Sequence, residues 1–174
     1  MEYSKENKIF MAEAIKEAES ALKKNEVPVG AVVVHKGEIV GRGHNMKEFS
    51  GDPTSHAEII AIREAAERLK GWRLDGSTIY VTIEPCIMCM GAVLQARVST
   101  LVFGCYDPKA GACGSLYDLS NDSRLNHRVN VISGVGAEEA GYLLKRFFMG
   151  LRKRSGVEST VKMTDSNRGL KASR

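Results

Sequence analysis

The sequence predicts an α/β protein, a three-layer α/β/α sandwich around one five-stranded mixed sheet. Segments with helical spacing of apolar residues alternate with short runs rich in β-branched residues, an order typical of a sheet covered by helices. The chain has 174 residues, with 43% hydrophobic and 26% charged, an ordinary globular balance. It shows no internal repeat and no dividing linker, so a single domain is expected.

The first half of the chain predicts a helix, a hairpin and a second helix. Residues 5–24 carry apolar side chains at helical spacing between Lys and Glu, which predicts an amphipathic helix. The segments VGAVVV and EIVGRG flank the dipeptide Lys36-Gly37, a short turn that predicts a β-hairpin. Thr54 or Ser55 is expected to cap a helix that runs to about Lys70.

The second half predicts three strands and two helices. The expected strands are STIYVTI, STLVFG and RVNVIS. Pro85 is placed to open a helix that runs to about Arg97, since proline is well tolerated at a helix start. A glycine-rich loop covers about residues 105–116. The last helix is expected from Glu138 to about Lys153, with its apolar face formed by Leu143, Leu144, Phe147 and Leu151.

The C-terminal end is basic. From Lys145 to Arg174 the chain holds nine basic and two acidic residues, a local charge of +7 in a chain whose total is +4. Such an end can contact a polyanion such as nucleic acid, or can be merely solvated. Residues 155–174 are polar and are expected to form a disordered basic tail, so the expected domain spans residues 1–154.

The compartment is expected to be the cytoplasm, with no membrane contact. The N-terminus MEYSKENKIF has acidic residues and no apolar core of a signal peptide. No apolar run is long enough to span a bilayer. Thiols stay reduced in the cytoplasm, so the four cysteines suggest metal ligands, catalytic groups or buried filler before disulfides.

A histidine, a glutamate and two cysteines form the most informative pattern. His56 and Glu58 stand at the start of one expected helix, and Cys86 and Cys89 in the first turn of the next. Helix N-termini favour thiolate, the form that binds metal. Three protein ligands with an open position for water are typical of catalytic zinc, which lowers the pKa of its water toward about 7 and yields a hydroxide nucleophile. Glu58 is then placed to shuttle protons.

Each part of this pattern has a simpler alternative. A lone histidine at a helix start is often a cap or a surface residue, and a lone CxxC can be a redox pair or half of a structural zinc site. Cys105 and Cys113 could complete a four-cysteine site, although their spacing suggests loop or filler residues instead. The combination of HxE at one junction and PCxxC at the next is far more specific than either part.

HxE followed by PCxxC is the signature of the zinc-dependent cytidine and nucleobase deaminases, which the chain resembles. Over about residues 5–154 it is similar, more narrowly, to the bacterial tRNA-specific adenosine deaminases. The blocks that carry this resemblance are, in order, EVPVGAVVV, GHN, DPTSHAEI, EPCIMCMGA, FGCYDPKAGACGSLYDL, NHRV and RFFMGLRKR. The resemblance implies a cytidine deaminase-like fold.

The resemblance also implies roles for individual residues. His56, Cys86 and Cys89 would bind one Zn²⁺ per subunit, and Glu58 would be the proton shuttle. The side chain of Asn45 and the backbone at Ala57 would contact the substrate base, in a pocket whose wall is formed in part by Glu26, Val27 and Pro28. Asp107 and Lys109 would contact the RNA strand beside the target. Phe148, Arg152 and Lys153 on the last helix would provide stacking and phosphate contacts. Between adjacent phenylalanines about 100° apart on a helix, Phe147 fits the apolar stripe and leaves Phe148 for stacking.

The implied reaction is hydrolytic deamination of the wobble adenosine to inosine in a tRNA anticodon stem-loop, an arginine tRNA above all, by a homodimer. One alternative is a deaminase of a free base or nucleoside such as guanine, cytosine or cytidine, which needs no basic last helix. A remote alternative is a noncatalytic, zinc-stabilised RNA-binding protein, which has no use for Glu58 beside an open metal position.

Overall fold

The computed structural model describes residues 3–166, and side chains as far as residue 153. Its centre is a five-stranded sheet of order β2-β1-β3-β4-β5. β1 runs antiparallel to both of its neighbours, whereas β3, β4 and β5 run parallel to one another. The predicted mixed sheet is therefore confirmed. Its strands are β1 (Gly30–His35), β2 (Glu38–His44), β3 (Ser77–Ile83), β4 (Thr100–Cys105) and β5 (Asn130–Ser133).

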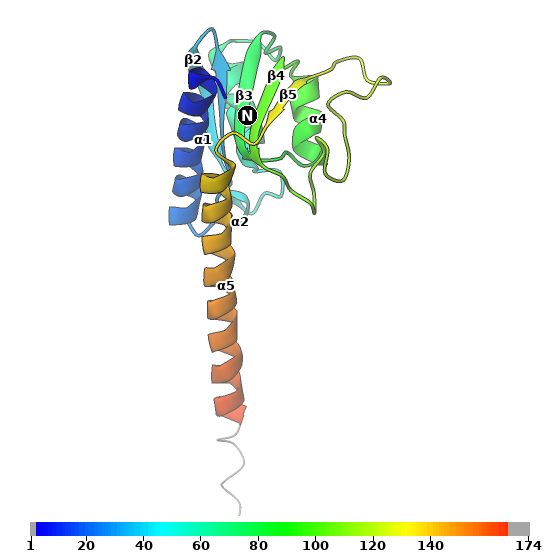
Figure 1. The fold of residues 1–174 in the computed structure, drawn as a ribbon. Coiled ribbons are helices and arrows are strands. Elements are labelled where there is room, and N and C mark those ends of the chain that lie inside the picture. Colours follow the sequence, from blue (N-terminus) through cyan, green and yellow to red (C-terminus); the bar gives the residue numbers. More distant parts are fainter. Residues whose placement is uncertain (1–2, 167–174) are drawn as a thin grey trace, which may run out of the picture.

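Helices cover both faces of the sheet, as Figure 1 shows. On one face, α1 (Lys5–Lys23) and α5 (Ala137–Ser166) pack on β1, β3 and β4. On the other face lie α3 (Ala57–Arg68) and α4 (Ile87–Gln95), and a short helix, α2 (Lys47–Ser50), follows β2. No helix in the described part of the chain is both long and apolar enough to cross a membrane.

The alternation of side chains along the strands supplies both apolar layers. On β1, Val32 and Val34 face the α1 side, while Ala31 and Val33 face the α3 side. A glycine brings α3 close to β2, because a Cβ atom added at Gly43 would lie only 2.2 Å from a backbone oxygen of α3. The alternating pattern read from the sequence thus builds two cores, one on each face of a single sheet.

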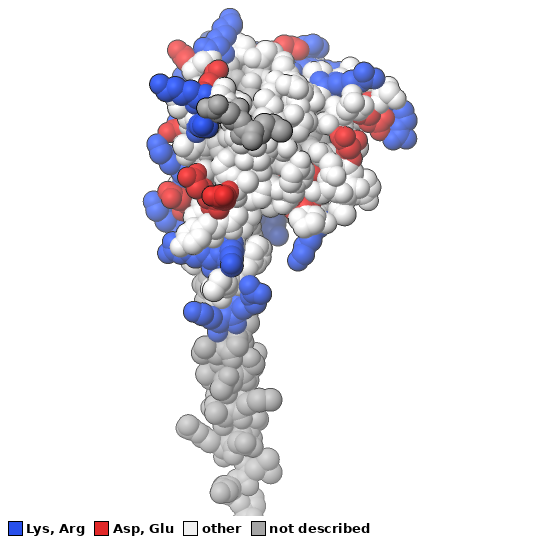
Figure 2. Space-filling model, in the orientation of Figure 1, with Lys and Arg blue, Asp and Glu red and all other residues white. Residues whose placement is uncertain are grey.

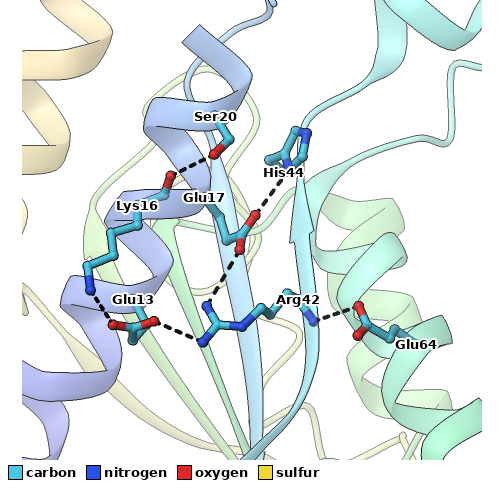
Figure 3. A network of polar contacts seen from close by, with 7 residues as sticks. All are labelled: Glu13, Lys16, Glu17, Ser20, Arg42, His44 and Glu64. Atoms are coloured by element: carbon cyan, nitrogen blue, oxygen red, sulfur yellow. Dashed lines mark hydrogen bonds and ion pairs between the residues drawn. The ribbon is translucent and has the colours of Figure 1, made fainter. Parts of the chain in front are cut away.

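A polar network ties α1 to β2 and α3 (Figure 3). The Arg42 guanidinium donates to Glu13 at 2.9 Å and lies 3.5 Å from Glu17. The backbone N–H of Arg42 donates to Glu64 of α3 at 3.0 Å. His44 Nδ1 lies 3.1 Å from Glu17 Oε2. Partly exposed ion pairs add little stability individually, but together these contacts fix the end of β2 where His44 stands.

The strand directions gather several loops at one edge of the sheet. β2, β3, β4 and β5 all end at this edge, and β1 begins there. The loops that follow β2, β3 and β4 therefore meet the loop that leads into β1. In α/β sheets the edge at which parallel strands end is the usual place for a ligand.

Two helix starts differ from the sequence prediction. Thr54 and Ser55 do not cap α3, because their side chains and the Thr54 N–H donate to Asp52 instead. His56 is the N-cap residue of α3, without a side-chain cap. Likewise Cys86 is the N-cap of α4, which begins at Ile87 and ends at Gln95, two residues before the expected end.

The last helix differs in its length and in one residue of its apolar face. α5 continues to Ser166, past the predicted end near Lys153. The predicted disorder of the tail that begins at residue 155 stays a prediction. Extending an existing helix adds one hydrogen bond per residue, and no proline interrupts this segment. The prediction for residues 167–174 lies outside the described residues. Phe147 is buried and Phe148 exposed as predicted, but Leu151 is exposed because α5 has passed the sheet by then.

Candidate active site

Two helix starts bring the predicted metal ligands together. His56 precedes α3 with extended backbone angles, and Cys86 precedes α4 in the same way. Cys89 follows one turn into α4 and is fully buried. The Nδ1 atom of His56 lies 3.8 Å from the Cys86 sulfur and 3.6 Å from the Cys89 sulfur. All three ligand atoms lie within 4.8 Å of one another.

This spacing fits a tetrahedral zinc ion. Bonds of about 2.1 Å to nitrogen and 2.3 Å to sulfur, at the tetrahedral angle, place nitrogen and sulfur about 3.6 Å apart. The two observed nitrogen–sulfur distances, 3.6 and 3.8 Å, lie at or just above that value. One imidazole and two sulfurs are also donors that zinc prefers, and three of them leave a fourth position open.

The electrostatics of the three ligands favour a bound cation. A hydrogen bond from Cys89 and a further one from His56 lower the pKa of Cys86 to about 4, against the effect of burial. The contact with Cys86 and burial raise the pKa of Cys89 far above its usual range. The hydrogen bond to Cys86 raises the pKa of His56. A thiolate is thus present at neutral pH, and metal binding would displace the remaining protons.

Glu58 lies beside these ligands in the first turn of α3. It is 3% exposed, and it borders the same cleft as His56 and Cys86. Burial and the charge on Cys86, opposed by the charge on His56, raise the pKa of Glu58 to about 7. A carboxyl group with a pKa near neutrality can both accept and return a proton at physiological pH, which suits general acid–base catalysis.

A cleft opens in front of the ligands and encloses about 460 Å³, within the range of small-molecule sites. Its walls come from the loops gathered at the strand ends and from α5. Of the residues predicted from the sequence, those that line the cleft are Val27, Asn45, His56, Ala57, Glu58, Cys86, Asp107, Lys109 and Phe148. Residues from six separate segments therefore meet around one cavity.

Glu26 and Pro28 do not line this cleft, although the pocket wall was expected to include them. Both are buried behind it. The Glu26 carboxylate accepts a hydrogen bond from Asn45 Nδ2 at 3.0 Å and one from the Phe49 N–H at 2.6 Å. Because a carboxylate only accepts, this contact fixes the orientation of the Asn45 amide. Glu26 therefore supports the cleft indirectly, by positioning Asn45.

Glu84 has a similar supporting role on the opposite wall, and sequence reasoning missed it. It directly follows β3, just before Pro85, and is 2% exposed. Its carboxylate accepts from the N–H groups of Asp107 at 3.0 Å, Cys113 at 2.8 Å and Ser115 at 3.0 Å, and from the Ser115 hydroxyl. Burial opposes its ionisation, but these hydrogen bonds together lower the pKa of Glu84.

Replacing Glu84 with Gln is expected to destabilise the protein. An amide offers one acceptor oxygen, so at least one buried N–H of the 107–115 loop loses its partner, at a cost of about 1–3 kcal/mol. The midpoint temperature of thermal unfolding should then fall by roughly 2–12 °C for a chain of this size. Ser115→Ala is the matched control, because it removes one hydroxyl donor and keeps the carboxylate. A midpoint for Glu84→Gln equal to that of the wild type would contradict the anchoring role.

The remaining predicted residues lie outside the cleft. Arg152 and Lys153 are exposed on α5 and do not line it. Cys105 and Cys113 do not join the ligand cluster: the Cys105 thiol donates to the Thr82 carbonyl at 3.5 Å, and Cys113 lies 3.4 Å from the sulfur of Met90. The four cysteines are all free thiols.

Several lining residues carry no signal in the sequence. Lys47 stands in α2, a helix of four residues that the sequence analysis did not predict. Tyr106 and Leu144 also line the cleft, the first from the end of β4 and the second from α5. Leu144 was assigned to an apolar stripe, and nothing in that stripe distinguishes a residue that faces a cleft from one that faces the core.

The chain is similar to known deaminases. A family described as MafB19-like deaminase matches residues 5–152. The tRNA-specific adenosine deaminase of Bacillus subtilis (strain 168) is 50% identical over 149 residues, which cover 86% of this chain and 92% of the relative.

Two solved deaminase structures share this fold. One, from work on A-to-I editing by tRNA:A34 deaminases at the wobble position of transfer RNA, is 41% identical with a TM-score of 0.76, covering 78% of this chain and 99% of its own. A guanine deaminase from Bacillus subtilis is 36% identical with a TM-score of 0.54, covering 56% of this chain and 63% of its own. The chain therefore belongs to the family of the tRNA-specific adenosine deaminases.

Proposed function

We propose that this protein hydrolyses the 6-amino group of the wobble adenosine in a tRNA anticodon loop and so produces inosine and ammonia. The observation that carries the proposal is the group of His56, Cys86 and Cys89 with Glu58 buried beside it in one cleft. Membership of the tRNA-specific adenosine deaminase family supports the choice of substrate. The bases of an anticodon loop are unpaired, so one of them can enter such a cleft at little cost.

The proposed cofactor is one Zn²⁺ per subunit, held by His56 Nδ1 and the sulfurs of Cys86 and Cys89. When bound there, zinc supplies a Lewis acid that lowers the pKa of a water molecule toward neutrality. The nitrogen–sulfur distances and the thiolate character of Cys86 support this assignment.

Glu58 is proposed as the residue that moves protons. Its carboxylate takes one proton from the attacking water and delivers it to N1 of the purine, then takes the second proton from the hydroxyl group now on C6 and delivers it to the departing amino nitrogen. Water adds to C6 and ammonia leaves from the same carbon, so the glutamate is restored at the end of the cycle. The buried position of Glu58 and its pKa of about 7 support both halves of this exchange.

The rest of the cleft is proposed to hold the base. Asn45 offers its amide oxygen and its second N–H, since the first N–H already donates to Glu26. Ala57 begins α3, where a backbone N–H has no partner within the helix and can meet a polar substrate atom. Val27 supplies an apolar wall that excludes bulk water.

Contacts to the RNA strand are proposed for Asp107, Lys109, Phe148, Arg152 and Lys153. Lys109 and Phe148 lie at one side of the cleft, and Phe148 is 45% exposed. Figure 2 shows Lys and Arg side chains gathered where α5 leaves the domain. A cationic surface next to an exposed aromatic ring suits unpaired nucleotides and their phosphates.

Neutralising Arg152 and Lys153 as Arg152→Gln and Lys153→Gln is expected to weaken RNA binding and flatten its dependence on salt. Each lost phosphate contact reduces the slope of log K against log salt by about 0.7 for a single strand. Affinities for an anticodon stem-loop measured from low to moderate salt would show this. Lys16→Gln, on α1 away from the cleft, is the control, and an equal slope in all variants would contradict this placement of the RNA.

We also propose that the protein forms a homodimer in the cytoplasm. The α4 sequence IMCMGAVLQ contains no charged residue although Ile87 is 51% exposed, so this helix presents an uncharged surface that a second copy could cover. A cytoplasmic location suits both a tRNA substrate and free zinc-ligand thiols. Sedimentation velocity tests the dimer, with Ile87→Asp expected to shift it toward monomer.

The function is tested by comparing substrates side by side. Purified zinc-loaded protein is incubated with an arginine tRNA transcript that has adenosine at the wobble position, and separately with guanine, cytosine, cytidine and free adenosine. Mass spectrometry reads the products. Inosine at the wobble position with little turnover of small molecules is the expected result.

A free-base deaminase is the second candidate, because the guanine deaminase of Bacillus subtilis shares part of this fold. Turnover of a free base with the tRNA untouched would select it. Binding of the stem-loop without any turnover would instead select a noncatalytic RNA-binding protein.

A further inference from the structure

One side of the cleft has no RNA contact assigned to it in the function proposed above. A target base that enters the cleft from within an RNA strand has a neighbouring nucleotide on each side. The residues proposed to contact the RNA strand all lie after β4 or on α5. The opposite side is built by the end of β2 and by α2, which lie across β1 and β3 from β4, about 14 Å away at the usual strand spacing.

This second side carries an exposed aromatic ring and two cations, here called the Phe49 patch and consisting of Lys24, Lys47 and Phe49. Phe49 is 72% exposed, the highest value among the large apolar side chains in the described residues. The Lys24 ammonium lies 5.6 Å from the centre of its ring. Lys47 lines the cleft itself, and its ammonium lies 3.5 Å from the carboxylate of the exposed Glu48.

The patch is held in a fixed position relative to the cleft. The two oxygens of the buried Glu26 carboxylate accept from the Phe49 N–H and from Asn45 Nδ2, so one carboxylate group separates the patch from a residue that lines the cleft. An exposed ring whose backbone is held in this way loses little further freedom when a ligand binds.

Lys24 is held as well. Its ammonium lies 3.1 Å from His44 Nε2 and 3.3 Å from the sulfur of Met46. An ammonium group only donates, so Nε2 of His44 accepts and Nδ1 donates to Glu17. Figure 3 shows the far side of His44 joined to Glu17 and Arg42 in the network that connects α1 and β2.

We propose that the Phe49 patch is a second nucleotide subsite, in which the unpaired base next to the target stacks on Phe49 and its phosphate lies near Lys24 and Lys47. The inference rests on the proposed function, because it assumes that the cleft accepts a base within an RNA strand. Exposed aromatic rings flanked by cations are the means by which proteins hold unpaired nucleotides. The charge of the patch matches a phosphate, and the ring matches the face of any base.

Phe49→Ala is expected to weaken binding of a fluorescent anticodon stem-loop by about 5- to 150-fold, the range for loss of one stacked base. Trp72→Ala is the matched control. Trp72 is also exposed, at 62%, and has the Arg73 guanidinium 5.3 Å from its ring, but it precedes β3 and so lies at the opposite edge of the sheet. This control should bind like the wild type, and Phe49→Trp should restore binding.

An RNA lacking one base makes the test specific. Stem-loops with an abasic site directly before or directly after the target should bind the wild type more weakly than the intact stem-loop does. One of these two RNAs should bind Phe49→Ala and the wild type with equal affinity. That coupling would identify the stacked nucleotide. Equal losses from Phe49→Ala on the intact and both abasic RNAs would overturn the subsite.

Two further outcomes separate this inference from its alternatives. If Phe49→Ala sediments as a smaller species than the wild type, the patch is a contact between copies of the chain and the proposal is wrong. If the wild type deaminates none of the RNAs but does deaminate a free base, the proposed function is wrong. If the wild type deaminates the RNA fully and Phe49→Ala has no effect, the function stands and only the subsite is wrong.

Discussion

Replacing Glu58 with Gln should abolish deamination while the protein keeps its zinc. The amide has nearly the same shape but cannot take a proton from water, and loss of a general acid–base group costs about 10²–10⁴-fold in rate. Inosine formation in the stem-loop measures the rate, and elemental analysis measures the zinc. Turnover within a few-fold of the wild type would show that another group moves the protons.

Glu67→Gln is the matched control for Glu58→Gln. Glu67 stands on the same helix, α3, but is exposed, so the same chemical change there should leave both rate and stability as they were. Glu58 is buried and its ionised form is costly, as the upward shift of its pKa indicates. The amide at position 58 is therefore expected to leave the midpoint of thermal unfolding unchanged or higher. A lost reaction in a protein of equal stability separates catalysis from folding.

The parts of the molecule that could be predicted are those that short stretches of sequence determine. Lys36 and Gly37 form the predicted turn, with positive φ angles of 51° and 79°, and the strands on either side pair as expected. The ligands of the metal cluster follow from two short motifs. The motifs lie where α3 and α4 begin, with His56 and Cys86 as the N-cap residues of these helices.

The supporting carboxylates could not be predicted, because their partners lie far away in the sequence. Glu84 meets N–H groups from residues 107–115, and Glu26 meets Asn45 and Phe49. A buried carboxylate can satisfy any nearby donors, so its sequence position does not say which loop it holds. The expected Thr54 or Ser55 cap failed for a local reason: α3 begins at Ala57, so His56 is its N-cap residue, and both hydroxyls donate to Asp52 in the preceding turn.

Replacing Cys89 with Ser should remove the zinc, and with it the activity and part of the stability. The sulfur of Cys89 is one of three ligand atoms, and a neutral hydroxyl does not replace a thiolate as a zinc donor. Metal bound at the proposed site would join the start of α3 to the start of α4 and so contribute to folding. Zinc content, inosine formation and the unfolding midpoint should all fall together.

Cys105→Ser provides the comparison that makes this loss specific. Cys105 is half-buried at the end of β4, and its thiol donates to the Thr82 carbonyl, a bond that a hydroxyl can also make. This variant should keep its zinc and activity. A chelator applied to the wild type should reproduce the effects of Cys89→Ser, because both leave the site without metal. If Cys89→Ser retained full zinc, Cys89 would not be a ligand, and the third donor would have to come from elsewhere around the cleft.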